Sequence, residues 1–382
     1  MAHSDPPSTP GPTKPQQQDA PGADTEPETP SADGDLDGAT GAAALNEAEQ
    51  TDEDTARAEN AAETGSESPH DPGPEDAKPR RGPLDSAFPE FLRQLPETAR
   101  PYAALARWDR PVGIWLLTLP CWMGLAFARI PNGLSWHDPF WAVWFLIGAA
   151  AMRGAGCTWN DIADRDLDAG VARTAGRPLP AGEVRLTQAI VWLIVQLAAG
   201  FLVWLALPVD AKIVAVIALP LVALYPFMKR ATWWPQAWLG ATMNWGVLVG
   251  AATATHVSPA TILLWLGLAC WTIAYDTIYA LQDREDDALV GVKSTARLFG
   301  KRAVLGAFCF HMAGAAFVAL AALAMGAPRL GALAALLFLA HGIWQALQVG
   351  RGREKRALEV FKSNVWAGAI LAAGFVIAAI LS

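Results

Sequence analysis

Residues 157–180 bring four aspartates and an asparagine together, directly after a long apolar stretch. On a helix of about 100° per residue, Asn160, Asp164 and Asp168 share one face and Asp161 lies beside them, whereas Asp166 points elsewhere. Carboxylates in a row at the end of an apolar helix are unfavourable unless a cation neutralises them. Hard oxygen ligands suit Mg²⁺, which often shares its remaining positions with substrate phosphates. The row therefore predicts a Mg²⁺ site; the alternative is an acidic surface turn.

A second acidic row follows more than 100 residues later, in residues 275–287. Asp276, Asp283 and Asp287 fall within about 40° of one another on a continuous helix. Asp276 is expected about two turns inside the membrane, where an ionisable side chain is by default a functional hypothesis; the alternative is a salt bridge to a neighbouring helix. Two such rows on one side of a membrane can face each other and hold two Mg²⁺ ions.

Basic side chains near the two rows could bind a diphosphate. Arginine forks and lysine point charges both suit phosphate oxygens. For any one of them, the excess of basic residues in cytoplasmic loops is an adequate alternative explanation. The candidates are Arg153, Arg173, Arg177, Lys229 and Lys293. A separate loop, 225–236, mixes bases, aromatics and amides, and such a mixture could recognise an aromatic acid.

The elements that must position these residues belong to one of two unlike parts of the chain. Residues 1–78 hold 19 acidic and 3 basic residues and contain no Phe, Trp, Tyr, Ile or Val. Such a segment cannot bury enough apolar surface to offset its ordering entropy, so we expect residues 1–85 to form a disordered acidic cytoplasmic tail. It has neither a basic start nor a 7–15-residue apolar run, which argues against a secretory signal peptide.

The rest of the chain, about 100–382, consists of apolar segments separated by short charged loops. A membrane span takes roughly 20 apolar residues. On that criterion the sequence predicts an all-α, polytopic integral membrane protein with nine transmembrane helices. The expected spans are 111–130, 139–159, 186–207, 211–228, 237–256, 260–281, 301–326, 329–349 and 363–381.

The distribution of basic residues predicts the orientation. Loops on one side of the nine spans carry 17 lysines and arginines, and the opposite loops carry 3. The richer side is the cytoplasmic side. The N-terminus and both acidic rows are therefore expected there. The four cysteines have no paired spacing, so neither a disulfide framework nor a zinc site is indicated.

At these motifs the chain resembles the UbiA superfamily of intramembrane prenyltransferases. The first row matches its Asn-Asp-x-x-Asp-x-x-x-Asp motif at positions 160–168, and the second matches its Asp-x-x-x-Asp motif at 283–287. The strings at 225–230, 275–280 and 293–300 are similar to the 4-hydroxybenzoate polyprenyltransferase branch. The resemblance covers about residues 100–382, and residues 1–85 have no counterpart in it.

The resemblance implies Mg²⁺ dependence, a polyprenyl diphosphate donor and 4-hydroxybenzoate as acceptor, joined by electrophilic aromatic substitution. Asp276 is the candidate for orienting the phenol, Arg230 for pairing with the acceptor carboxylate, Asp161 for a further catalytic role and Tyr279 for substrate binding. The metal ligands implied are Asn160, Asp164, Asp168, Asp283 and Asp287. The location implied is a bacterial or mitochondrial inner membrane, with the site facing cytoplasm or matrix. Membrane lipid is the expected surrounding partner; nucleic acid is not expected, and no obligate protein partner is evident.

Three alternatives remain open from the residues. The first is a UbiA-type enzyme with another aromatic acceptor. The second is a CDP-alcohol phosphotransferase, although its acids lie in one compact run. The third is a secondary transporter, although transporter sites lie near the bilayer midplane, whereas the acids here cluster toward one face.

Overall fold

The computed structural model describes residues 89–169, 174–289, 291–350 and 356–382. These residues belong to the second of the two units into which the chain divides, Lys78–Ser382. Within them the secondary structure is helical and no strand occurs, which confirms the all-α prediction. Residues 1–85 and Arg173, both named in the sequence-based predictions, lie outside the described residues.

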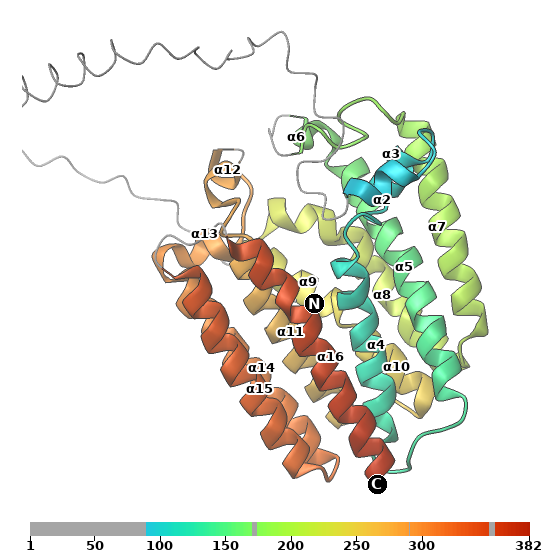
Figure 1. The fold of residues 1–382 in the computed structure, drawn as a ribbon, viewed down its shortest axis with the longest axis vertical. Helices are drawn as coiled ribbons and strands as arrows, with labels where there is room; N and C mark the ends of the chain where they lie inside the picture. The colour runs from blue at the N-terminus through green and yellow to red at the C-terminus, as the bar shows by residue number, and fades with distance from the viewer. Residues whose placement is uncertain (1–88, 170–173, 290, 351–355) are drawn as a thin grey trace, which may run out of the picture. The chain divides into compact units, whose positions relative to one another are not determined.

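The helices follow one another with short connections, and their order is shown in Figure 1. The first half contains α2 (Pro89–Gln94), α3 (Arg100–Leu105), α4 (Val112–Arg129), α5 (Asp138–Ala163), α6 (Arg165–Asp168), α7 (Leu186–Ala206) and α8 (Val209–Ala231). The second half contains α9 (Pro235–Met243), α10 (Gly246–Ala254), α11 (Pro259–Tyr279), α12 (Arg284–Leu289), α13 (Thr295–Phe299), the 3-10 turn η1 (Gly300–Arg302), α14 (Ala303–Ala324), α15 (Pro328–Val349) and α16 (Ala357–Leu381).

Eight helical stretches in the described chain are long and apolar enough to cross a membrane. Their outer faces are apolar as well. On α7, for example, Val191 and Leu202 are 61% and 64% exposed, which suits contact with lipid rather than water. Lipid cannot hydrogen-bond the backbone, and helices satisfy these groups internally. The protein is therefore an integral membrane protein.

The expectation of nine continuous membrane helices is not confirmed, because the predicted span 237–256 is two nine-residue helices, α9 and α10. The break lies at Asn244, whose side chain is buried. Its amide nitrogen donates to the carbonyl oxygens of Gly240 (2.8 Å) and Leu268 (3.1 Å) and to Oγ1 of Thr272 (2.7 Å). The amide ties the break to α11, so tertiary hydrogen bonds support an interruption within an apolar segment.

The central helix of the bundle is α11, which packs against α14, α9 and α16, and α4 packs against α10 and α16. The α4–α10 contact depends on close backbone approach, because a Cβ atom at Gly250 would lie 2.2 Å from the carbonyl oxygen of Cys121. The main apolar core contains Met123, Phe127 and Leu264. In Figure 1, the short helices α6 and α12 lie at the same end of the bundle. This end carries both acidic rows.

Candidate active site

The first acidic row lies where α5 ends and α6 begins. Asp164 caps α5 with φ −102° and ψ 6°, so the predicted single helix is interrupted there. Asp161, Asp164 and Asp168 are nevertheless all buried. Asp166 is exposed and pairs with its neighbour Arg165, at 2.9 Å between Nε and Oδ1. The prediction that Asp166 points away from the row is confirmed.

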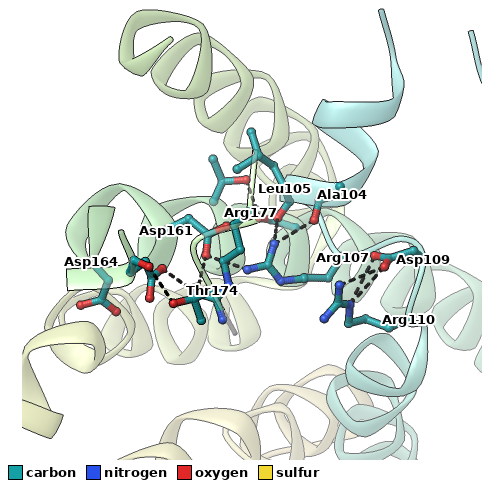
Figure 2. Close-up of polar contacts among 12 residues, drawn as sticks. Ala104, Leu105, Arg107, Asp109, Arg110, Asp161, Asp164, Thr174 and Arg177 are labelled. Carbon is teal, nitrogen blue, oxygen red and sulfur yellow. Dashed lines mark hydrogen bonds and ion pairs between the residues drawn. The ribbon is translucent and has the colours of Figure 1, made fainter. Parts of the chain in front are cut away.

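Two arginines connect the buried aspartates of this row (Figure 2). Nη2 of Arg107 lies 2.7 Å from Oδ1 of Asp161. Nη1 of Arg177 lies 3.3 Å from the same oxygen and 2.6 Å from Oδ2 of Asp168. Burial raises the pKa of the Asp168 carboxyl group, and the charge of Arg177 opposes that rise. The second oxygen of Asp161, Oδ2, is buried and has no hydrogen-bond partner among the residues that the structure describes.

Arg107 is a member of this site that the sequence did not indicate. Its backbone is left-handed, with φ 58°, a conformation that is uncommon for a residue with a Cβ atom. Its guanidinium also donates to the carbonyl oxygen of Ala104 at 2.8 Å. The one signal in the sequence is that Arg107 and Arg110 flank an aspartate in the segment before α4.

Asp164 is held by the end of α8. Nζ of Lys229 lies 2.5 Å from its Oδ2, and Nη2 of Arg230 lies 2.9 Å from its Oδ1. The same nitrogen of Arg230 donates to the carbonyl oxygen of Ala163 at 3.1 Å. The sequence had set Arg230 apart from the acidic rows as a partner for an acceptor carboxylate. In the structure it is bound to the first row.

The second row does not form one helical face, so that prediction is wrong. The chain leaves α11 after Tyr279 in a turn that contains Asp283, and α12 carries Asp287. The turn begins where the amide of Ala280 bonds back to the carbonyl oxygen of Asp276 at 2.9 Å. The three acids of this row therefore come from a helix, a turn and a second helix.

Both rows nevertheless open onto a single cavity of about 230 Å³ at this end of the bundle. Eight of the predicted site residues line it: Asn160, Asp168, Arg177, Lys229, Asp276, Asp283, Asp287 and Lys293. Residues that the sequence did not assign as site residues also line it, among them Thr174, Tyr225, Gln236 and Ser294. The cavity thus combines oxygen donors from two rows with three basic side chains.

The remaining described site residues are not among those that line the cavity. These are Arg153, Asp161, Asp164, Arg230 and Tyr279. Arg153 interacts electrostatically with Asp276, and it packs on Gly113, where a Cβ atom would lie 2.4 Å from its Nε. The ring of Tyr279 packs on Phe361, with centroids 4.7 Å apart.

The loop before α13 is fastened to α8. The backbone amide of Lys293 donates to the carbonyl oxygen of Lys229 at 2.9 Å, and Nζ of Lys293 donates to the carbonyl oxygen of Ala231 at 3.3 Å. This contact brings two basic residues from distant parts of the sequence to one side of the cavity. Clustered positive charge of this kind suits a diphosphate.

No three His, Cys, Asp or Glu side chains converge as a metal-binding group among the described residues. The aspartates of the first row form ion pairs with Arg107, Arg177 and Lys229. Fold and site together define a polytopic helical membrane protein with a charged cavity at one end of its bundle, able to bind an anion between acidic and basic walls.

The chain belongs to the UbiA prenyltransferase family, whose sequence pattern matches residues 117–379. The predicted resemblance is confirmed. Relatives include the mitochondrial 4-hydroxybenzoate polyprenyltransferase of Arabidopsis thaliana, 42% identical over 289 residues that cover 74% of this chain and 70% of that protein. The protein of the same name from Bos taurus is 40% identical over 304 residues, which cover 78% and 81% of the two chains.

Solved structures agree on the fold. The apo structure of a UbiA homolog from Aeropyrum pernix K1 matches with a TM-score of 0.58 at 25% identity, covering 69% of this chain and 97% of that one. A UbiA homolog from Archaeoglobus fulgidus bound to GPP and Mg²⁺ matches with a TM-score of 0.58 at 20% identity, covering 74% and 100%. Mg²⁺ is thus bound by that homolog.

Proposed function

We propose that this protein transfers a polyprenyl group from polyprenyl diphosphate to 4-hydroxybenzoate, at the ring carbon ortho to the hydroxyl group, and releases diphosphate. One observation carries the proposal. Two acidic rows more than 100 residues apart open onto one cavity, together with Arg177, Lys229 and Lys293. The names of the relatives in Arabidopsis thaliana and Bos taurus point to the same acceptor.

The donor set fits Mg²⁺ as the metal. The side chains of Asn160, Asp168, Asp283 and Asp287 offer oxygen ligands to the cavity. Mg²⁺ prefers oxygen ligands and retains water, so it does not need a closed cage of protein side chains. When bound, it would neutralise charge on the diphosphate as the C–O bond breaks.

The basic side chains of the cavity bind the diphosphate in this proposal. Arg177, Lys229 and Lys293 place fixed positive charge where negative charge develops on the leaving group. The apolar walls, which include Leu167, Pro226 and Ala280, limit access of water to the allylic cation. The isoprenoid tail of the donor extends into lipid, which accounts for a membrane location.

Two carboxylates have separate tasks. Asp276 lines the cavity, and in this proposal it orients the acceptor phenol, while a carboxylate or the released diphosphate takes up the ring proton. Asp161 is bound by Arg107 and Arg177 and does not line the cavity. Its task in this proposal is to position Arg177 rather than to accept a proton.

Arg230 remains the proposed partner of the acceptor carboxylate. Its side chain is 46% exposed, and Lys229 already contacts the other oxygen of Asp164. The guanidinium can therefore turn toward an incoming carboxylate while Asp164 keeps one cationic partner. An arginine fork binds a carboxylate with two parallel hydrogen bonds.

The proposed location is a bacterial or mitochondrial inner membrane, with the cavity facing cytoplasm or matrix. The support is the excess of basic residues in the loops at the cavity side, which is typical of cytoplasmic loops.

The test is prenyl transfer in membranes that contain the expressed protein. Radiolabelled 4-hydroxybenzoate, Mg²⁺ and polyprenyl diphosphates of several lengths are added, and the labelled lipid is identified by mass spectrometry. A lipid prenylated ortho to the hydroxyl supports the proposal. Transfer only to other aromatic acceptors would replace 4-hydroxybenzoate in it, and no transfer to any acceptor would refute it.

A further inference from the structure

Arg297, in the short helix α13, contacts three residues of the cavity wall but is not itself among the lining residues. Its Nη1 donates to the carbonyl oxygen of Asp287 at 3.1 Å and also to the carbonyl oxygen of Val292. Its backbone amide donates to Oγ of Ser294 at 3.3 Å. Asp287, Val292 and Ser294 all line the cavity. One arginine is thus bonded to the cavity wall through both its side chain and its backbone.

The guanidinium group reinforces a hydrogen bond of the backbone. The amide of Val292 donates to the carbonyl oxygen of Asp287 at 2.9 Å, and Nη1 of Arg297 donates to the same oxygen. A carbonyl oxygen has two lone pairs, and a terminal guanidinium nitrogen carries two N–H groups, so one nitrogen can serve both carbonyl oxygens. A charged donor also forms stronger hydrogen bonds than a neutral one. Arg297 therefore fastens the backbone of Asp287 to that of Val292, the residue before Lys293.

The guanidinium group also packs against the loop between α8 and α9. Its Cζ atom lies 5.4 Å from the centroid of the Trp233 ring, which is within the range of a cation–π interaction. Just before this loop, the carbonyl oxygen of Lys229 accepts the bond from the amide of Lys293 at 2.9 Å. Arg297 and Lys293 thus join the segment before α13 to the end of α8 and its loop through separate contacts.

These contacts affect two charged groups that the second half of the chain contributes to the cavity. Asp287 is a proposed ligand of Mg²⁺ and Lys293 a proposed ligand of the diphosphate, and both line the cavity. The helices on either side of this segment, α12 and α13, have only six and five residues. Helices of this length are not stable in isolation, so their placement depends on tertiary contacts such as those of Arg297.

We propose that Arg297 is a positioning residue for donor binding: it holds the backbone at Asp287 and Val292 so that the carboxylate of Asp287 and the ammonium group of Lys293 serve the same diphosphate with its Mg²⁺. The inference rests on the proposed function, because the diphosphate donor is the one proposed there. It assigns Arg297 no contact with the substrate and no chemical step.

The test replaces Arg297 in two ways. Arg297→Met removes the charge and the donors of the guanidinium group but keeps an unbranched side chain, whereas Arg297→Lys keeps a charged donor. Arg100→Met is the matched control, since the guanidinium group of Arg100 also donates to two backbone carbonyl oxygens, those of Leu95 (3.0 Å) and Arg93 (3.0 Å). None of these three residues lines the cavity.

The first measurement is the binding of inorganic diphosphate in the presence of Mg²⁺, by calorimetry on the full chain in nanodiscs. Arg297→Met is expected to raise the Kd about tenfold or more, or about 1.4 kcal/mol, as when other residues that orient metal ligands are removed. Arg297→Lys is expected to recover most of that loss, because it retains a charged donor. Arg100→Met is expected to bind within about twofold of the wild type, because it leaves the contacts at the cavity wall in place.

A second measurement needs neither ligand nor turnover. The amides of Val292 and Lys293 bond the carbonyl oxygens of Asp287 and Lys229. Their hydrogen exchange is expected to accelerate in Arg297→Met, where the backbone has lost the guanidinium group, and to stay slow in Arg100→Met. In prenyl-transfer assays, Arg297→Met is expected to raise the KM for the polyprenyl diphosphate and to leave the KM for 4-hydroxybenzoate within about twofold.

An unchanged Kd for diphosphate in an Arg297→Met protein that inserts normally would overturn the inference. Equal weakening in Arg100→Met, or equal rises in both KM values, would also overturn it, because either result indicates a general loss of structure. Unchanged exchange at Val292 and Lys293 would show that Arg297 does not hold this backbone. A wild-type protein that forms no prenylated product would refute the proposed function itself, and the binding and exchange results would still decide the role of Arg297.

Discussion

Arg107 and Asp161 form a buried ion pair across 54 positions of the sequence, with 2.7 Å between Nη2 and Oδ1. The arginine holds a left-handed backbone conformation at that point. Such a conformation costs about 1–3 kcal/mol and persists only where the surroundings enforce it. The pair therefore links the segment before α4 to the first acidic row, and through Arg177 to Asp168.

Replacing Arg107 should impair catalysis as well as stability. In Arg107→Ala, Asp161 keeps only Arg177, which is then drawn away from Asp168. We expect kcat/KM to fall about 10- to 100-fold per folded molecule, as for other residues that orient a charged site. The control is Arg129→Ala, which breaks a partly buried pair with Asp138 outside the cavity lining (3.0 Å). It should lower the thermal midpoint without a comparable loss of kcat/KM. Equal activity losses in the two variants would contradict a specific role for Arg107.

Loss of a cavity carboxylate should abolish turnover. Asp283→Asn keeps the shape of the side chain and removes the charge that we assign to Mg²⁺ binding, so we expect activity to drop more than about 100-fold with normal insertion. EDTA should stop the wild-type enzyme, and excess Mg²⁺ should restore it. Asp166→Asn, at an exposed position that pairs with Arg165, should keep near wild-type activity. Mg²⁺-dependent activity that survives in Asp283→Asn would remove this residue from the metal site.

Arg230 and Arg177 should affect different substrates. A charged hydrogen bond contributes about 1.5–3 kcal/mol, so Arg230→Ala should raise the KM for 4-hydroxybenzoate by about one to two orders of magnitude. Arg177→Ala should instead raise the KM for the diphosphate. Steady-state kinetics with each substrate varied in turn distinguish the two. Because Arg230 contacts Asp164, a rise in the diphosphate KM alone would make it part of the donor site.

Deleting residues 1–85 should leave catalysis nearly intact. Residues 1–78 hold 19 acidic and 3 basic residues, and the whole segment contains few bulky apolar residues, so we expect it to supply little packing to the bundle. The truncated protein should insert in comparable amounts and keep its kcat and both KM values within about twofold. A truncated protein that inserts normally but loses most activity would give the tail a part in the reaction.

Long apolar segments made the membrane helices predictable to within a few residues, as at α7 and α15, because hydropathy alone determines them. The first acidic row was predictable because its residues are close in sequence. The interruption of the second row was not predictable. The sequence indicates one continuous helix there, whereas α11 ends at Tyr279 and a turn precedes α12. Arg107 was missed because its partner comes from a distant helix and becomes its neighbour only after packing.

The break at Asn244 also determines the parity of the topology. The chain reaches the cavity end at Lys229 on α8 and returns to that end at Asp276 on α11, so α9 and α10 together must carry it to the far end in between. The described chain contains eight uninterrupted apolar stretches, and an even number of crossings would place the chain before the first and after the last of them on one membrane face. We propose that the broken pair acts as one further crossing, which makes the total odd. A reporter fused after Ser382 would thus lie on the membrane face opposite the cavity, where it would not obstruct access of the substrates to the cavity.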